Sequence, residues 1–416
     1  MLLFRSWHFS IASAALVLAG GCLQALADDV SLDNLTFTTK AGGTATIKHV
    51  EFDGTNLTRD EVAKLFSPTG TREELTPIVA KLKAAKILIP DLVVATKDAT
   101  GTLTFHDFQA TGVSEGKIEH MSLAGFDGTG TVPDAGPVTV HSGPIAIDGG
   151  DFSRLLPALR DGNFASAGGA QITHFTWQGF NMTFPDKETP ATADGGNLFK
   201  LAIDSVEGRG TYDGDLPAKG SAEMSTFTLE PPKASKFGRS LAEFGYDRLD
   251  IGFTMSGSYD ANAKTYVLDD YTIRGVDAGS LGFKAQFGGI DRSAFSGDQT
   301  SRLAALANGN VSSAAVTFVN NGLFEKAVAY VAKMQQKTPD AIKQQWSAMA
   351  TQLLPAFLVG NPGALKLAAA VTKFIAAPKA LTVTAAAKGG PVAFGDFATG
   401  EPALLLQRID LDATAQ

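Results

Sequence analysis

The pentapeptide GVSEG at residues 112–116 has the form of a hydrolase nucleophile site. In α/β hydrolases the G-x-S-x-G pattern places its serine on a sharp turn between a strand and a helix, beside backbone N–H donors. Asp134 and His141 follow Ser114 in the order that a serine, acid and histidine triad would need. The segments on both sides alternate like strands, however, so we expect a hairpin turn here. A serine hydrolase using Ser114 is therefore the last of three candidate functions.

Metal chemistry has weaker candidates. With no cysteine to assist and no metal-ligand spacing among the histidines, we expect them to be exposed on strands or turns. Acidic glycine-containing segments at 148–151 and 213–215 lack the alternating aspartates and distant glutamate of a calcium loop, so ordinary turns are favoured over calcium sites. The sequence thus predicts no catalytic residue, no metal and no cofactor. The histidines concerned are His49, His106, His120, His141 and His174.

The first 27 residues have the pattern of a secretory signal peptide. Arg5 precedes a short apolar run at 11–19, and Ala25 and Ala27 are the small residues that a signal peptidase reads. We expect cleavage after Ala27 and export to the periplasm of a Gram-negative bacterium, where the protein would belong to the cell envelope. A lipoprotein cut before Cys22 and an uncleaved membrane anchor are the alternatives.

Composition limits the remaining possibilities. The leader holds the only cysteine, so an exported chain would depend on core burial rather than on disulfides. The formal charge is −8 without basic runs, which argues against nucleic acid and against electrostatic docking on anionic lipid. The most apolar later stretch, 353–378, is interrupted by Asn361, Pro362 and two lysines, so we expect no integral membrane span in the mature chain.

Period-two alternation is the commonest pattern after the leader. Between residues 249 and 255 every second residue is apolar, with polar or small residues between, and the same holds for 281–287 and 409–413. Such alternation predicts half-buried strands. Turn residues at 260–264 join two such runs into a hairpin over 248–275. The alternation slips phase at Asp269 and Asp270, as a β-bulge would cause.

Two segments of the first half, 52–59 and 147–154, echo each other. In each, an apolar residue precedes Asp-Gly, which predicts a turn, and Thr58 or Ser153 stands where a helix N-cap belongs. Helix-compatible sequence follows both caps, so we expect two diverged strand–turn–helix units. The expected helices are 60–66, 71–86 and 154–160.

Residues 320–378 change to a helical period. Thr338 and Pro339 form a strong helix start, with a capping hydroxyl and a proline at the first helical position. Asn361 and Pro362 open the last of three amphipathic helices. Each helix is apolar on one face only and must cover another apolar surface, for which the alternating strands are the obvious partner.

These patterns predict an α+β fold that is predominantly an antiparallel β meander. It would carry a cluster of three amphipathic helices near the C-terminus and strand–turn–helix units in the N-terminal half. We expect a signal peptide at 1–27, a β-rich region at 28–184, a linker or long loop at 185–197, and a C-terminal meander at 198–416 with its helical cluster at 320–378.

Short motifs flank the helical segment. VTFVNNGL at 316–323 precedes it, and PKALTV at 378–383 and PV at 391–392 follow it. In outline this arrangement resembles the YdgA-like family of bacterial envelope proteins and, more remotely, the AsmA-like proteins. The resemblance implies an envelope location and a sheet-plus-helix build. AsmA-like proteins are associated with lipid traffic between membranes, and the YdgA-like family offers no functional residue to carry over.

The function hypotheses rest on the apolar faces. A meander with one apolar face must cover it, because wet apolar surface costs about 25 cal/mol per Å². If the helices leave part of it open, an apolar ligand such as a lipid or acyl chain fits there, and the protein is a non-enzymatic periplasmic carrier. If they cover all of it, the protein is an envelope structural or assembly factor without a small ligand. Candidate lining residues are Phe253, Met255, Phe283, Phe287, Trp346 and Phe357.

Overall fold

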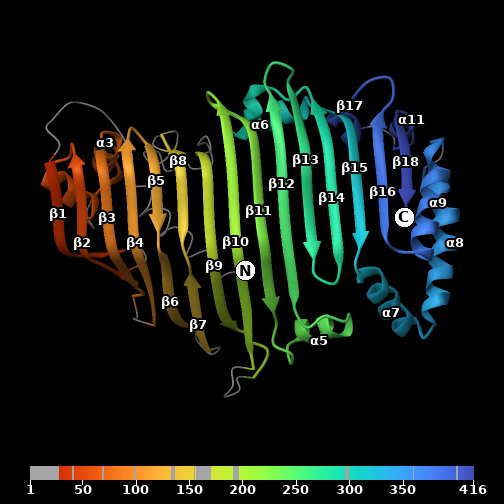
Figure 1. Ribbon diagram of the computed structural model, residues 1–416, viewed down its shortest axis with the longest axis horizontal. Helices are drawn as coiled ribbons and strands as arrows, with labels where there is room; N and C mark the ends of the chain where they lie inside the picture. The colour runs from red at the N-terminus through yellow and green to blue at the C-terminus, as the bar shows by residue number, and fades with distance from the viewer. Residues whose placement is uncertain are drawn as a thin grey trace. The chain divides into compact units, whose positions relative to one another are not determined.

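The structure is a computed structural model that describes residues 28–39, 42–67, 70–97, 100–132, 136–153, 155, 170–190, 196–295, 299–358, 360–399 and 402–416. The expected leader, Asp134 and all but Leu155 of the helix expected at 154–160 lie outside these residues. The chain divides into two compact units, unit 1 (residues 1–210) and unit 2 (residues 211–416). Both are rich in antiparallel strands, as predicted (Figure 1). Within the described residues no helix has both the length and the apolar character needed to cross a membrane.

Unit 1 is built on a sheet whose middle part is two strands deep along its length. β1 to β4 pair in sequence order, but β4 pairs with both β5 and β6, and β9 pairs with both β7 and β8 (Figure 1). Since β5 pairs with β8 and β6 with β7, this part of the sheet departs from a simple meander. The strands are β1 (Asp28–Thr38), β2 (Thr44–Thr55), β3 (Lys83–Ala95), β4 (Gly101–Ser114), β5 (Lys117–Leu123), β6 (Gly125–Val132), β7 (Gly136–Ser142), β8 (Ile145–Asp151), β9 (Gln171–Pro185) and β10 (Leu198–Asp213).

Two short helices, α2 (Arg59–Leu65) and α3 (Arg72–Ala80), cover one face of β1 to β5. Thr58 caps α2 as predicted, and each helix begins with a capping box in which a threonine and a glutamate three residues later satisfy each other's backbone N–H groups. The core that they close includes Phe52, Val62 and Leu82, none of which has exposed surface.

The helix expected at 71–86 was predicted too long. It ends at Ala80, and Lys83 begins β3, which pairs with β2 and β4. Ala84 and Ile87 are buried against that core. Their burial and two ladders of strand pairing outweigh the helix-forming tendency of the Lys-Ala-Ala-Lys sequence.

The Asp-Gly pairs at 53–54 and 148–149 lie inside β2 and β8, where the sequence predicted turns. Gly54 and Gly149 have φ of +58° and +61°, so they bend the strand without ending it. A Cβ on Gly149 would lie 2.3 Å from Oγ1 of Thr173, so the missing side chain also lets β8 lie close to β9.

Unit 2 contains a regular antiparallel order of strands. β11 (Leu216–Glu230), β12 (Leu249–Asp260), β13 (Thr265–Gly275), β14 (Gly279–Gly288), β15 (Asn310–Asn320), β16 (Ala380–Ala387) and β18 (Ile409–Ala415) pair successively, and β17 (Val392–Ala393) adds to β15. The hairpin expected at 248–275 is β12 and β13. Its bulge is also confirmed, because Ser256 pairs with Asp270 and Gly257 with Leu268, which leaves Asp269 as the extra residue.

The helices of unit 2 lie at the ends and one edge of this sheet (Figure 1). Thr338 caps α8, accepting a hydrogen bond from the N–H of Ala341 at 3.2 Å, and Pro339 occupies the first helical position as predicted. The helices are α5 (Lys236–Glu243), the short 3₁₀ helix η1 (Arg292–Ala294), α6 (Gln299–Ala307), α7 (Leu323–Gln335), α8 (Pro339–Phe357), α9 (Gly363–Ala376), α10 (Phe394–Thr399) and α11 (Pro402–Gln407).

Helix α9 runs along β18, the last strand of the sheet. Asn361 donates a hydrogen bond through Nδ2 to the carbonyl of Ile409 (2.8 Å), and Lys373 donates through Nζ to the carbonyl of Ala415 (2.6 Å). These carbonyls would otherwise form an unpaired strand edge, which is a liability for aggregation. The helix therefore protects this edge of the sheet.

Candidate functional site

The register of the unit 2 strands gathers apolar side chains on one face. Ile273 lies opposite Phe253 on one side and Leu281 on the other. Residues directly opposite each other in an antiparallel ladder point to the same face, and so do residues two positions further along each strand. We call the resulting surface the open face. It consists of Phe253, Met255, Tyr271, Ile273, Leu281, Phe283 and Val316.

Much of the open face is in contact with solvent. Met255, Ile273, Leu281 and Val316 are 37%, 39%, 37% and 36% exposed. The aromatic residues between them shield each other, because the ring of Tyr271 makes edge contacts with Phe253 and Phe283 at centroid distances of 5.2 and 6.0 Å. Contiguous exposed apolar side chains of this kind mark binding surfaces more often than they occur without a role.

On the β15 side the open face ends where α7 and α9 begin to cover the sheet. Phe318, opposite Leu281, packs against Phe374 of α9 at a ring distance of 5.6 Å, and Phe374 contacts Phe324 of α7 at 5.3 Å. Leu381 of β16 belongs to the same cluster. The helices thus cover the apolar face over β15, β16 and β18, and they do not reach the side chains of β12 to β14.

Towards one end of the strands the same face is closed by a second cluster. Tyr259 packs against Phe295, next to η1, at a ring distance of 4.4 Å, and its hydroxyl donates to the carbonyl of Ile290 at 2.9 Å. Phe287 contacts Phe394 of α10 at 5.9 Å. The open face is therefore a bounded surface between two packed clusters of aromatic side chains.

Polar groups occupy the opposite face of these strands. Asp270 accepts hydrogen bonds from the hydroxyls of Thr254 (2.6 Å) and Thr272 (2.7 Å). These bonds hold the pKa of the Asp270 carboxyl below its usual range, so it stays ionised. A partner of the open face would meet hydrophobic side chains, with the phenol of Tyr271 as the polar exception.

The structure distributes the predicted lining residues over several places. Phe253, Met255 and Phe283 lie together on the open face. Phe287 lies in the cluster at its end. Trp346 packs against Phe324 between α7 and α8, at a ring distance of 5.8 Å.

Phe357, the last residue of α8, is 75% exposed. Four members of the open face were not on the predicted set: Tyr271, Ile273, Leu281 and Val316. Their alternation was visible in the sequence, but their alignment with Phe253 depends on the bulge at Asp269 and on strand pairing.

The pentapeptide around Ser114 forms the hairpin turn that its flanks predicted. Ser114 ends β4, and β5 starts at Lys117, so the serine is followed by a strand and not by the helix of a nucleophile elbow. His141, on β7, has its Nδ1 2.7 Å from Oδ1 of Asp127 on β6. Asp134 lies outside the described residues.

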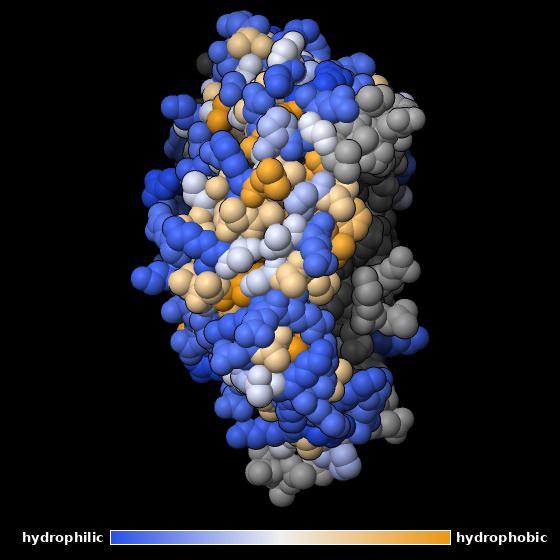
Figure 2. All heavy atoms as spheres, turned by 90° about the vertical axis from the view of Figure 1, so that its right-hand side faces the viewer, coloured by the Kyte–Doolittle hydropathy of each residue, from blue (hydrophilic) through white to orange (hydrophobic). Residues whose placement is uncertain are grey.

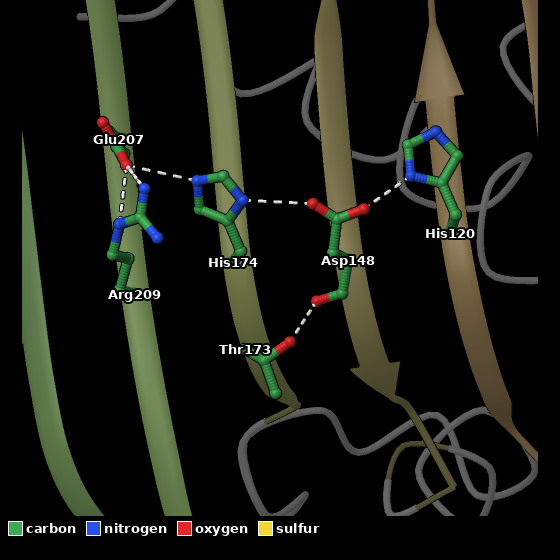
Figure 3. A network of polar contacts seen from close by, with 6 residues as sticks. All are labelled: His120, Asp148, Thr173, His174, Glu207 and Arg209. Carbon is green, nitrogen blue, oxygen red and sulfur yellow. Dashed lines mark hydrogen bonds and ion pairs between the residues drawn. The ribbon is translucent and has the colours of Figure 1, made fainter.

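The histidines of unit 1 lie on strands, as predicted, and each faces a carboxylate on a neighbouring strand. Figure 3 shows the longest chain of contacts. His120 Nδ1 is 2.6 Å from one oxygen of Asp148, and His174 Nδ1 is 3.1 Å from the other. His174 Nε2 is 3.2 Å from Glu207, which also pairs with Arg209. The hydrogen bonds from His120 and His174 lower the pKa of the Asp148 carboxyl.

The remaining histidines repeat this arrangement. His106 and His141 share the carboxylate of Asp127, and His49 faces Asp33. Within the described ranges no group of three or more such side chains has the geometry to hold a metal ion. We interpret the pairs as cross-strand contacts that stabilise the polar face of unit 1. The sequence offered no signal for them, because the partners are 14 to 33 positions apart.

Comparison with known proteins adds one finding. A family model described as an uncharacterized protein matches residues 272–416, which include β14, β15 and helices α7 to α9. No curated protein matches the chain. The match names no activity, and the resemblance to YdgA-like proteins stays a prediction.

Proposed function

We propose that this protein is a non-enzymatic carrier that binds the acyl chain of a lipid on the open face. The observation that carries the proposal is the exposure of Met255, Ile273, Leu281 and Val316 on one continuous apolar surface. That surface is bounded by packed clusters, so it is a defined area and not a generally loose side of the sheet.

The size of the open face favours a narrow ligand over a protein. It spans β12 to β15, about 15 Å at the usual spacing between strands. A stable protein interface needs about 800 Å² from each partner, which is several times the area of two rows of side chains over this width. An acyl chain is narrow and has no hydrogen bonds to satisfy.

A row of small side chains supports the same choice. Ala285 lies opposite Ala314, which lies opposite Ala385. This row separates Phe283 and Val316 of the open face from the cluster around Phe287. An extended hydrocarbon chain lying across the strands fits between two rows of larger side chains, where only methyl groups rise from the sheet.

The expected affinity is modest. Covering the remaining third of one apolar side chain of the open face is worth about 0.5–1 kcal/mol, since full burial is worth about 1.5–3 kcal/mol. Each buried methylene of the ligand adds about 0.8 kcal/mol. Association itself costs about 4 kcal/mol or more, so a fatty acyl chain would bind with about micromolar affinity at best. Such a carrier can release its ligand again.

The predicted leader supports a periplasmic location, and the flanking motifs and the three helices of the C-terminal half support membership of the YdgA-like family. N-terminal sequencing of the exported protein tests the leader, because cleavage after Ala27 leaves a chain that starts at Asp28. Retention of Met1 or a lipid on Cys22 would contradict that location model.

Solvent extraction of the purified protein, followed by mass spectrometry, tests the carrier function. We expect a lipid or fatty acid in the extract and uptake of a fluorescent fatty acid by the extracted protein. A clean extract together with no uptake would refute the proposal. In that case a stable protein partner recovered from the envelope would support the second candidate, a structural or assembly factor, which the exposed apolar side chains of α8 also favour.

A further inference from the structure

The apolar stripe of α8 is covered along only half of its length. Ile342 is buried beside α7, and Trp346 contacts Phe324. Further along the same stripe, Met349, Leu353 and Phe357 are 46%, 43% and 75% exposed. Figure 2, which faces the side of unit 2 where α8 and α9 lie, shows hydrophobic side chains among hydrophilic ones there.

Leu365 extends this exposed stripe onto α9. It is 71% exposed. The hydroxyls of Thr351 and Thr372 lie 3.5 Å apart between the two antiparallel helices, so Leu365 lies at the same end of the helix pair as Phe357. We call Met349, Leu353, Phe357 and Leu365 the helical stripe.

The helices that carry this stripe form a basic region in an acidic protein. Residues 323–376 contain six lysines against Glu325 and Asp340, a formal charge of +4, whereas the whole chain carries −8. Within the described part of the chain, Lys333 and Lys343 have no ion-pair partner. The charge of the whole sequence argued against anionic lipid, but the local charge of this surface has the opposite sign. The six lysines are Lys326, Lys333, Lys337, Lys343, Lys366 and Lys373.

We propose that α7 to α9 dock on the surface of a lipid bilayer that contains anionic headgroups. Exposed large apolar side chains flanked by lysines are the pattern of helices that lie in the membrane interface, where the apolar groups enter the boundary of the acyl chains and the lysines remain at the headgroups. The helical stripe offers roughly 500 Å², taking about 200 Å² for a fully exposed large side chain. That area is smaller than a stable protein interface needs, and a bilayer requires no matching pockets.

Co-sedimentation with vesicles tests this docking. The full-length protein is mixed with vesicles of equimolar phosphatidylglycerol and phosphatidylcholine, and in parallel with vesicles of phosphatidylcholine alone. We compare the parent with a Phe357→Ser, Leu365→Ser double variant and with a control, Leu303→Ser, which removes a side chain that is 59% exposed on α6. All three carry the same N-terminal segment, so its affinity for lipid cancels in the comparison.

We expect the double variant to bind the anionic vesicles at least about tenfold more weakly than the parent, with the control unchanged. The parent should also prefer the anionic vesicles by about tenfold, and this preference should fall with added salt. Equal binding by parent and double variant would overturn the proposal. So would self-association of the parent that the double variant loses, because a second copy of the chain would then occupy the helical stripe.

The same double variant separates this inference from the carrier function. The helical stripe and the open face share no residue, so uptake of a fluorescent fatty acid should be equal in parent and double variant. Loss of vesicle binding with normal uptake supports docking, whatever the fate of the carrier proposal.

Discussion

Replacing Leu281 by aspartate is the sharpest test of the open face. Leu281 is 37% exposed, so covering it with a ligand would contribute about 0.5–1 kcal/mol, which the variant loses. A carboxylate beneath a bound acyl chain also loses hydration without gaining a partner, at a cost of about 2 kcal/mol or more. The sum of about 3 kcal/mol predicts a loss of affinity of about a hundredfold.

The control is Gln286→Asp on the same strand. Gln286 is exposed on the opposite face, so it receives the same charge without touching the open face. Titration of each purified variant with a fluorescent fatty acid gives the affinity, and a thermal melt reports folding. Because most of the Leu281 side chain is already packed, Leu281→Asp should also lower the stability by about 1–2 kcal/mol and Tm by a few degrees.

Equal affinities of Leu281→Asp and Gln286→Asp, with both proteins folded, would refute the reasoning. Such a result would mean that the ligand binds elsewhere or that the exposed side chains of β12 to β15 have no ligand. A Leu281→Met variant, which keeps the apolar surface, should bind like the parent and shows whether shape alone matters.

Three further predictions concern stability. The pKa of Asp148 is lowered by His120 and His174, so its contribution is present above the unfolded value of about 3.9 and is lost as pH falls through the lower folded value. Asp148→Asn should therefore flatten the fall in Tm below about pH 4, and an unchanged acid limb would contradict this. Because the pair is well exposed, the effect at neutral pH should be at most a few tenths of a kcal/mol. Thr71→Ala removes the cap of α3 and should cost about 1 kcal/mol in urea unfolding, whereas Thr71→Ser should retain most of it. Phe374→Ala, at a position 6% exposed between two other rings, should cost about 3–5 kcal/mol, and a loss below about 1 kcal/mol would show that α9 is loosely packed.

Local features of this fold could be predicted because they depend on neighbouring residues. Alternation over 249–255 predicted β12, since successive side chains of a strand point to opposite faces. The phase slip at Asp269 predicted the bulge. The hydroxyl of Thr338 before Pro339 predicted the first turn of α8, because capping involves only groups within one helical turn.

Features that depend on distant partners could not be predicted. Lys83 joins a strand because β2 and β4 bind it on both sides, although its neighbours favour a helix. The Asp148 carboxylate meets two histidines only through the pairing of β5, β8 and β9. In both cases the deciding contact joins residues far apart in the chain.

The sequence by itself determined that β12 to β15 each have one apolar side, because the period of a strand is written in the order of its residues. Only the tertiary structure decided how much of that side is covered. Phe318 is shielded because Phe374 of α9 packs on it, 56 positions later in the chain, while Leu281 beside it is left open. The length of α7 and the position of α9 along the edge strand set that limit, and neither can be read from an alternation of polar and apolar residues.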